Sequence, residues 1–499
     1  MGGMSAAAVP HLIAGRFGES ASDRTDPIPD PATGETIAEL RYSSDEEVDA
    51  AVRAAADALP EWSNTPAPDR AQAMFRLKGL LEERFEELSQ LVVRENGKTI
   101  AEARGEVRRG IEVVELACGA PSLLMGTTLD QIAEGIDEEL VRFPVGVVAG
   151  ITPFNFPNMV PLWMIPLALV CGNTFVLKPS QRTPLSAVRL AELIAEAGLP
   201  DGVFNVVHGA GEAVTALLEH PLVSAVSFVG SAGVARWIYA TAAAGGKRVQ
   251  ALGGAKNHLV VMDDAEVEPS VTALISSAFG NAGQRCLAGS VAVGVGRLGE
   301  ALAREVARQA QSLRLGPGAD PGTDMGPVIR DERRKELIGE IEDGERAGAK
   351  LVTDGRGAGP DRGFFLGPTV FDGVTPDMRL WQTELFGPVL SVMRADDIDD
   401  AIRLMNASEY GNAASIFTSS GRNAREFRRR AEAGMIGVNI GVAAPMAFFP
   451  FTGWKGSFYG DLHATGADGV RFYTRHKVIT SRWFVPPALD HTLPEGRGH

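Results

Sequence analysis

The sequence contains little cysteine and no histidine pair with metal-ligand spacing. Its 499 residues include three cysteines, Cys118, Cys171 and Cys286, too few and too scattered for a disulfide framework or a CxxC motif. A lone cysteine is commonly a small buried hydrophobe, and we assign that role to Cys118 and Cys171. The eight histidines form no HxxxH or HExxH pair, so we predict no protein-held metal. This composition favours a reducing, cytoplasmic compartment.

The chain is also short of positive charge. It has 48 lysines and arginines against 63 aspartates and glutamates, a formal net charge of -15. Nucleic acids and anionic membranes are bound by clustered basic residues, so neither is an expected partner. An anionic substrate has to be attracted by local arginines that act against the overall field.

Long uninterrupted hydrophobic runs are absent. Residues 143–177 carry no charge, but prolines at positions 144, 153, 157, 161 and 166 divide the segment into strand, loop, short helix and strand. A membrane-spanning helix requires ~20 consecutive apolar residues, so we predict none here. Residues 1–6 lack the basic and apolar regions of a signal peptide. They also miss the myristoylation pattern, because position 6 is alanine, so no targeting segment is expected.

The sequence does contain a regular alternation of strand-like and helix-like segments. Short β-rich runs at 145–151, 174–177, 203–207, 225–228 and 259–262 alternate with helical stretches such as 185–197 and 232–244. This order is typical of βαβ units with a parallel sheet. The length exceeds that of a single hydrophobic core, so we expect an α/β protein of two or more domains.

Helical periodicity is also present outside this region. Ser44 and Glu47 form a capping box before an alanine-rich helix. Further helices are predicted over 69–96, 100–120, 299–312 and 330–347. The tail 469–483 alternates like a strand, which makes it a candidate to extend a sheet of a neighbouring subunit.

The segment 280–286 places Cys286 directly after Arg285. Gly280 and Gly283 allow close backbone approach, and the adjacent arginine favours the reactive thiolate. This local pattern leaves both a catalytic thiol and a buried apolar cysteine open.

Two junctions between strand and loop carry polar groups. Segment 151–157 ends a strand in a proline-braced turn with Asn155, whose amide either satisfies its own turn or stabilises an oxyanion. Segment 173–180 places Lys178 at the carboxyl end of a buried strand, where open α/β sheets bind ligands. Lys178 is thus either a surface residue or a ligand for ribose or phosphate.

Two further segments are only weak indications of a binding site when each is taken alone. Gly230 and Ser231 join a strand to a helix whose N-terminal N–H groups suit a diphosphate, although the full GxGxxG fingerprint is missing. Glu384 and Phe386 couple a carboxylate with an aromatic ring before a turn, and alone they are typical of a solvated glutamate and a core phenylalanine.

In combination these segments point to one protein family. The ordered occurrence of PFNFP (153–157), KPS (178–180), FVGS (228–231), GQRC (283–286) and ELFGP (384–388) resembles the aldehyde dehydrogenase superfamily over about residues 11–483. Within it, the segments 105–110, 250–258, 449–457 and 460–463 are most similar to the CoA-acylating methylmalonate-semialdehyde (malonate-semialdehyde) dehydrogenases.

The resemblance implies roles for individual residues. Cys286 matches the nucleophile, and Asn155 matches the oxyanion amide, which acts together with the Cys286 backbone N–H. Arg109 and Arg285 match the pair that holds the substrate carboxylate, and Arg108, the alternative in register, is interpreted as a solvated helix residue. The implied cofactor-binding residues are Thr152, Phe154, Lys178 (adenosine ribose), Gln181, Gly230, Ser231 (diphosphate), Leu252, Glu384 (nicotinamide ribose) and Phe386 (nicotinamide).

The chain departs from its relatives at four places. Leu252 stands 34 residues before Cys286, where hydrolytic members carry the glutamate that activates water, so the acyl intermediate is not expected to react with water. Gln181 replaces a ribose-binding glutamate, which leaves NADP open beside NAD. Asn158 and the segment 441–445 differ from the inositol-degradation members of the subfamily, which leaves the side group of the substrate undecided.

The resemblance implies an aldehyde dehydrogenase-like α/β fold. It consists of a Rossmann-like NAD-binding domain (1–126 and 144–252), a catalytic domain (253–455) and a β-rich oligomerisation element (127–143 and 469–484) of a homotetramer, a dimer of dimers.

The implied reaction is the NAD-dependent oxidative decarboxylation of malonate or methylmalonate semialdehyde. A cysteinyl thioester then transfers its acyl group to CoA, giving acetyl-CoA or propionyl-CoA. The alternative is a hydrolytic dehydrogenase for an anionic aldehyde. A non-catalytic member would be expected to lose Cys286 or Asn155, and both are present.

Overall fold

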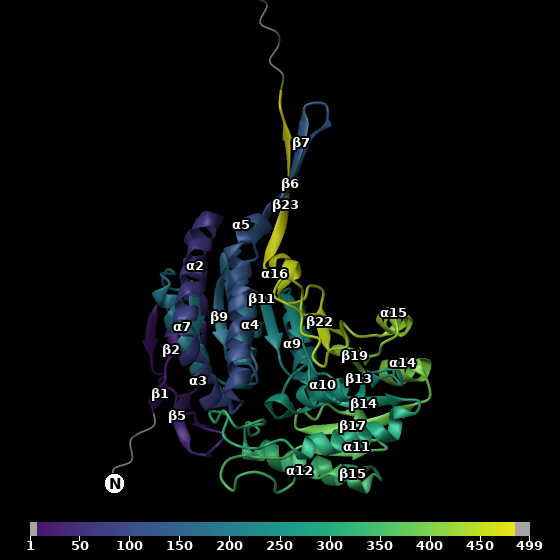
Figure 1. Cartoon of the computed structure of the whole chain (residues 1–499). Coiled ribbons are helices and arrows are strands. Elements are labelled where there is room, and N and C mark those ends of the chain that lie inside the picture. Colours follow the sequence, from purple (N-terminus) through teal and green to yellow (C-terminus); the bar gives the residue numbers. More distant parts are fainter. Residues whose placement is uncertain (1–6, 485–499) are drawn as a thin grey trace, which may run out of the picture.

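The computed structural model describes residues 7–484, which form two large sheets covered by helices and a small sheet that projects from the body (Figure 1). Residues 1–6, where the sequence predicted no targeting segment, lie outside the described residues, as do 485–499. The α/β fold class is confirmed. The domain boundaries given above remain predictions.

The first large sheet has a parallel centre with antiparallel strands at its edges. Its strands, in spatial order, are β22 (Phe458–Gly460), β12 (Arg248–Leu252), β11 (Val223–Val229), β8 (Val147–Ile151), β9 (Thr174–Lys178), β10 (Phe204–Val206), β2 (His11–Ile13) and β3 (Arg16–Gly18). The predicted strands between 145 and 228 all lie in this sheet.

Helices bury both faces of this sheet. One face packs against α2 (Ala67–Glu83), α4 (Ile100–Cys118), α6 (Met159–Val170) and α7 (Leu185–Glu196). The other packs against α1 (Asp45–Asn64), α8 (Gly211–Glu219) and α9 (Ala232–Ala244). Every residue of α6 is buried, as expected for a helix that is apolar all round. The uncharged segment 143–177 is therefore strand, loop, helix and strand, as predicted.

The second large sheet is parallel except at one edge strand, β15. Its strands are β15 (Lys350–Thr353), β16 (Thr369–Asp372), β17 (Val389–Ala395), β14 (Gly289–Val295), β13 (Asn257–Val261), β19 (Ala413–Phe417) and β20 (Met435–Val438). Its associated helices are α10 (Val267–Phe279), α11 (Leu298–Gln311), α12 (Asp331–Arg346), α14 (Ile398–Asn406) and α15 (Gly421–Arg430).

Smaller elements complete the body. They are the three-stranded sheet of β1 (Ala7–Val9), β5 (Thr36–Arg41) and β4 (Thr25–Pro29), the pair β18 (Tyr410–Gly411) and β21 (Trp454–Lys455), and the short helices α5 (Ala120–Leu123) and α13 (Arg379–Gln382).

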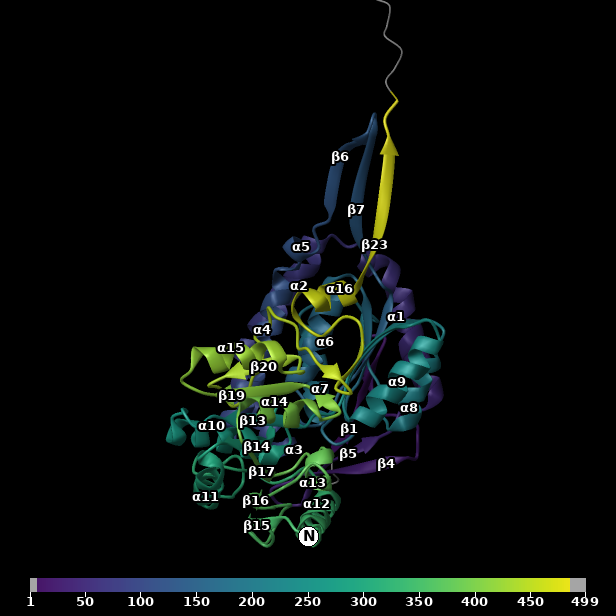
Figure 2. The ribbon, with the colours of Figure 1, turned by 90° about the vertical axis from the view of Figure 1, so that its right-hand side faces the viewer.

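An antiparallel arm extends from the body, as both ribbon views show (Figures 1 and 2). It consists of β6 (Thr127–Ala133), β7 (Ile136–Pro144) and β23 (Thr474–Arg482), with β7 in the middle. The register runs from Thr474 opposite Pro144 to Arg482 opposite Ile136. The C-terminal strand therefore pairs with a strand of its own chain.

Two predicted elements differ from the structure. The helix predicted over 69–96 is two helices, α2 and α3 (Phe85–Asn96), because Arg84 leaves the helical region between them without glycine or proline to mark the break. The strand predicted from 469 begins at Thr474, because the residues before it form the helix α16 (Gly466–Phe472). Val470 and Phe472 of this helix are buried.

Candidate active site

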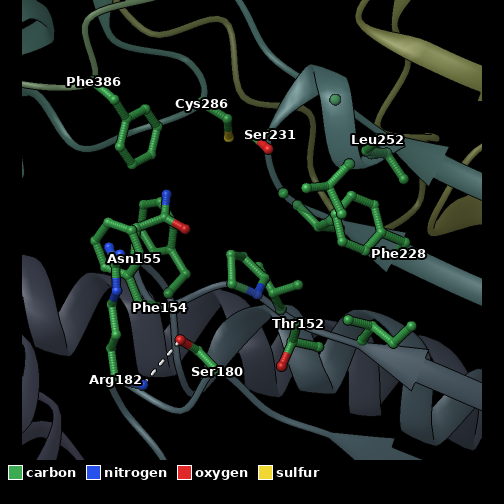
Figure 3. A pocket seen from close by; sticks show the side chains of 18 of the residues that line it. Thr152, Phe154, Asn155, Ser180, Arg182, Phe228, Ser231, Leu252, Cys286 and Phe386 are labelled. Carbon is green, nitrogen blue, oxygen red and sulfur yellow. Dashed lines mark hydrogen bonds between the residues drawn. The ribbon is translucent and has the colours of Figure 1, made fainter. Parts of the chain in front are cut away.

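The carboxyl ends of the parallel strands β8, β9, β11 and β12 open onto a pocket of about 600 Å³, which we call the larger pocket (Figure 3). All residues predicted to bind the cofactor line it, together with both predicted catalytic residues. They are Thr152, Phe154, Asn155, Lys178, Gln181, Gly230, Ser231, Leu252, Cys286, Glu384 and Phe386. Segments far apart in sequence thus meet where open α/β sheets bind ligands.

A second pocket, of about 260 Å³, adjoins the first and is called the smaller pocket below. Both predicted substrate arginines, Arg109 and Arg285, line it. The two pockets share the lining residues Phe156, Trp163, Cys286 and Phe451. Cys286 therefore lies where the two spaces meet, with access to both.

A left-handed turn brings Cys286 to this junction. Asn281, Ala282 and Gly283 have φ angles of 51°, 49° and 71°. A Cβ atom on Gly283 would lie 2.1 Å from the Gly387 carbonyl oxygen, so this position requires glycine. The turn follows the end of α10 and redirects the chain into the site.

The backbone of Cys286 is held by two side-chain amides. Its carbonyl oxygen accepts hydrogen bonds from Asn257 Nδ2 at 2.9 Å and from Asn412 Nδ2 at 2.8 Å. Asn257 also bonds the Ala288 carbonyl and the Ala413 N–H. The nucleophile segment is thus tied to β13 and to the start of β19.

The environment of the Cys286 sulfur differs from the expectation drawn from the sequence. Burial and the nearby Glu384 carboxylate raise the pKa of the Cys286 thiol to about 12. Arg285 opposes this shift but has the smallest effect of the groups that act on the thiol, and its guanidinium bonds Glu102 at 2.6 Å. Arg285 lowers the thiol pKa, in the direction that the sequence predicted, but burial and Glu384 outweigh it, so the thiol form prevails near neutral pH.

Asn155 is buried beside Cys286. Its Nδ2 donates one hydrogen bond to the Gln284 carbonyl oxygen at 2.9 Å. An amide carries two N–H groups, so one remains for a ligand. The Cys286 sulfur and the Asn155 amide face one common space near Phe386 (Figure 3). This arrangement suits an oxyanion that forms on a carbonyl attacked by sulfur.

The cofactor end of the larger pocket has donors for ribose and phosphate. Lys178 is buried at the end of β9, and burial lowers the pKa of Lys178 to about 8, so a hydrogen-bond acceptor beside it would be favourable. Ser231 is the N-cap of the 13-residue helix α9. The N–H groups of its first turn are oriented to receive an anion. This donor set fits a dinucleotide.

The opposite end of the larger pocket joins a carboxylate to two rings. Burial raises the pKa of Glu384 to about 7, although its Oε1 accepts the Ala255 N–H at 3.0 Å. Phe386 packs edge-on against Phe154, with ring centroids 5.9 Å apart. A carboxylate beside an aromatic wall fits a ribose and the flat ring attached to it.

The two predicted substrate arginines are held differently. Arg285 forms the ion pair with Glu102 described above, whereas Arg109 lies 3.5 Å from Glu112 and donates to the Pro445 carbonyl and to the Met446 sulfur. The neighbouring Arg108 pairs with Glu82 on the exposed side of α4 and does not line either pocket. This position agrees with the interpretation of Arg108 as a solvated helix residue.

Sequence reasoning gave no role to several residues of the site. Glu102 and Asn412 contact the nucleophile segment, and Trp163 and Phe451 pack with tilted rings, centroids 4.7 Å apart, where the pockets meet. Glu102 is detectable only as the third helical residue after Thr99, the position of a capping box. No local pattern indicates that Asn412 reaches Cys286 from 126 residues away.

Two kinds of feature are absent from residues 7–484. This part of the chain holds no cluster of three histidine, cysteine, aspartate or glutamate side chains placed for a metal ion. Among its helices, none combines the length and the apolar character that crossing a membrane requires.

Comparison with known proteins agrees with this geometry. The model of the aldehyde dehydrogenase family matches residues 17–479. A malonate-semialdehyde dehydrogenase of Geobacillus kaustophilus is 56% identical over 475 residues, which cover 95% of this chain and 98% of the relative. A malonate-semialdehyde dehydrogenase of Halalkalibacterium halodurans is 54% identical over 474 residues, which cover 95% of this chain and 98% of the relative.

Solved structures give the same result. The methylmalonate-semialdehyde dehydrogenase of Oceanimonas doudoroffii has a TM-score of 0.94 and 50% identity, covering 97% of this chain and 99% of that one. A Sinorhizobium meliloti protein assigned to the same activity, solved with NAD, has a TM-score of 0.95 and 45% identity, covering 96% and 99%.

Proposed function

The chain belongs to the aldehyde dehydrogenase family, and we propose that it is a CoA-acylating malonate-semialdehyde or methylmalonate-semialdehyde dehydrogenase that uses NAD. One observation carries this proposal. Cys286 joins a dinucleotide-sized pocket to a smaller pocket with two arginines, and the residue 34 positions before it is Leu252 instead of a carboxylate.

The smaller pocket supports a short anionic aldehyde. Arg109 and Arg285 are permanently charged, and guanidinium groups bind carboxylates in a bidentate manner. Phe156, Trp163 and Phe451 supply an apolar wall next to the sulfur. A semialdehyde with its carboxylate toward the arginines has its carbonyl directed toward Cys286.

In the acylation step, the Cys286 thiol passes its proton to solvent water, and the thiolate forms a C–S bond to the aldehyde carbon. The carbonyl oxygen becomes an oxyanion that accepts hydrogen bonds from the Asn155 amide and the Cys286 N–H. Lys178, Ser231 and Glu384 would hold NAD, which when bound would supply the acceptor for the hydride. Loss of the hydride from carbon leaves a thioester on Cys286.

This acyl group carries a carboxylate beta to the thioester carbonyl. Cleavage of the carbon–carboxylate bond releases carbon dioxide and leaves an enolate, whose oxygen is stabilised by the same two N–H donors. Protonation at carbon gives an acetyl or propionyl group on Cys286. A CoA thiolate then forms the new thioester and releases the Cys286 sulfur as thiolate.

Leu252 is the reason for proposing CoA as acceptor instead of water. It is buried at the end of β12 and lines the larger pocket. An isobutyl group cannot take a proton from water, so hydrolysis of the thioester lacks its base. A thiol with a pKa near ~8.5 is already partly ionised near neutral pH and needs little help.

The remaining predictions belong to the same proposal. Gln181 lines the larger pocket without a charge that would repel a 2′-phosphate, so NADP is a candidate second cofactor. The arm exposes Leu129, Ile132, Val478 and Ile479, which supports its role in a homotetramer. The three free cysteines support a reducing, cytoplasmic location.

Mass spectrometry of the products tests the proposal. Purified enzyme, NAD and malonate or methylmalonate semialdehyde are incubated with and without CoA. We expect acetyl-CoA or propionyl-CoA, together with one carbon dioxide for each NADH. Malonate or methylmalonate as the main product, unaffected by CoA, would support the hydrolytic alternative instead.

A further inference from the structure

A buried ion pair lies directly behind Asn155. Lys98, in the turn between α3 and α4, contacts Glu106 of α4 with an Nζ–Oε2 distance of 2.5 Å. The two side chains are 1% and 0% exposed. Both residues line the smaller pocket. Removing two charges from water is unfavourable unless both are fully hydrogen-bonded, so their partners indicate what the pair does.

The partners of the pair lie in the segment that carries Asn155. Lys98 Nζ donates to the Asn155 carbonyl oxygen at 2.7 Å and lies 4.1 Å above the centre of the Phe156 ring. Glu106 Oε1 accepts the N–H groups of Asn158 at 2.8 Å and Met159 at 3.2 Å. The ion pair therefore holds the loop between β8 and α6 at both ends of residues 155–159.

The pair itself is rigidly placed. Gly97, before Lys98, has a φ of 89° and caps α3, and the Ile100 N–H after it bonds the Gly318 carbonyl at 2.8 Å. Glu106 lies two helical turns further along α4, whose start is fixed by the Thr99 capping box. A fixed cation and a fixed anion thus determine where the backbone of Asn155 lies.

We propose that Lys98 and Glu106 are positioning residues that orient the Asn155 amide toward the oxyanion. This inference rests on the oxyanion role proposed above for Asn155. The Asn155 side chain has one direct side-chain hydrogen bond, to Gln284, so its aim depends on the backbone from which it extends. Apolar residues of the same volume would fill this space with a smaller desolvation penalty, but they would bond neither the Asn155 carbonyl nor the α6 N–H groups.

A double-mutant cycle tests the inference. The variants are Lys98→Met/Glu106→Gln, Asn155→Ala, and the two combined. The first measurement is the single-turnover rate of NADH formation with propanal, which needs no carboxylate. The second is alkylation of Cys286 by iodoacetamide, a displacement at the same sulfur that forms no oxyanion.

We expect Lys98→Met/Glu106→Gln to slow NADH formation by about 10- to 100-fold, since a displacement near 1 Å is enough to lose ~100-fold in rate. Alkylation of Cys286 should change less than about twofold, because the thiol environment stays in place. In the Asn155→Ala background the same two substitutions should cause almost no further loss, because the group they orient is gone.

Three controls keep the outcomes distinct. Arg108→Met removes an exposed ion pair from the same helix and should alter neither rate. Glu106→Gln alone keeps an acceptor for the α6 N–H groups and replaces the double variant in the cycle if that variant does not fold. Binding of NAD, followed by fluorescence quenching, reports whether the larger pocket is intact.

The possible results separate the two proposals. An unchanged rate in Asn155→Ala would overturn the oxyanion role of Asn155 itself. Asn155→Ala is itself expected to form NADH slowly. If adding the Lys98 and Glu106 substitutions to it lowered the rate by the same factor as in the wild-type background, the positioning role alone would be overturned. A parallel fall in alkylation and NADH formation would do the same, since it would show a general collapse of the site.

Discussion

The guanidinium of Arg285 lies 2.6 Å from the carboxylate of Glu102 at the smaller pocket. The same carboxylate oxygen accepts the Asn281 N–H at 2.7 Å, and the other caps α4 through the Thr99 N–H. Arg285 is thus already paired before any substrate arrives. A substrate carboxylate has to share this arginine with Glu102.

Glu102→Gln should therefore strengthen binding of anionic aldehydes. The substitution removes one negative charge from the pocket and keeps an oxygen acceptor for the Asn281 N–H. We expect the KM for methylmalonate semialdehyde to fall by about threefold or more, with the KM for propanal unchanged. Steady-state kinetics on both substrates check this. A higher KM for the semialdehyde alone would show that Glu102 positions Arg285 instead of competing for it.

Replacing either substrate arginine should affect carboxylate-bearing substrates selectively. Loss of a hydrogen bond to a charged group costs about 1.5 to 3 kcal/mol, so Arg109→Leu and Arg285→Leu should lower kcat/KM for the semialdehyde by ~10- to 100-fold more than for propanal. Arg108→Leu, on the outer face of α4, is the matched control and should affect neither substrate. Equal losses on both substrates would argue against carboxylate recognition.

The Cys286 thiol should titrate far above neutrality in the cofactor-free enzyme. Burial and the Glu384 carboxylate raise its pKa to about 12, so the thiolate fraction rises by roughly tenfold for each pH unit below that value. Iodoacetamide alkylation should accelerate steadily from pH 7 to pH 9. The pKa of Glu384 is about 7, so Glu384→Gln removes a negative charge mainly above pH 7, where it should lower the thiol pKa and increase the rate.

Cys118→Ser/Cys171→Ser provides the background for that measurement, because Cys286 is then the one remaining thiol. A rate that is already independent of pH between 7 and 9 would indicate a stable thiolate and contradict the raised pKa. An unchanged rate in Glu384→Gln would assign the shift to burial alone.

Much of this site was predictable because its motifs are local. The order of the βαβ units, the strand-end positions of Asn155 and Lys178 and the Ser231 helix start are readable from short segments, and the structure brings these residues into one pocket. Their separate roles remain predictions. What joined them into one hypothesis was the resemblance, since each segment alone also fits an ordinary structural role.

The parts of the site that the sequence did not predict depend on contacts between residues far apart in the chain. The Glu102–Arg285 ion pair spans 183 residues and the Asn412–Cys286 hydrogen bond 126. Neither spacing has a periodic or motif signal. The sequence places Arg285 beside Cys286, but no local pattern indicates that Glu102 pairs with Arg285 or that burial and Glu384 dominate the pKa of the thiol.

Leu252→Glu should transfer part of the flux from CoA to water. The new carboxylate would lie in the larger pocket, which Cys286 also lines, and would deprotonate water for attack on the thioester. Burial would raise its pKa, so the gain should be partial and larger at high pH. Free acid measured by mass spectrometry checks this, with Leu252→Gln as the uncharged control. Free acid that rises equally in both variants would assign the effect to water access.

The dependence of NADH formation on CoA tests the central claim most directly. Rapid mixing of enzyme, NAD and semialdehyde without CoA should give a burst of about one NADH per active subunit and then a slow phase, because the Cys286 thioester forms but lacks a base for hydrolysis. Cys286→Ala should give no burst. Adding CoA should convert the slow phase into fast steady turnover with an acyl-CoA product. Equally fast turnover without CoA, with only free acid released, would contradict the account.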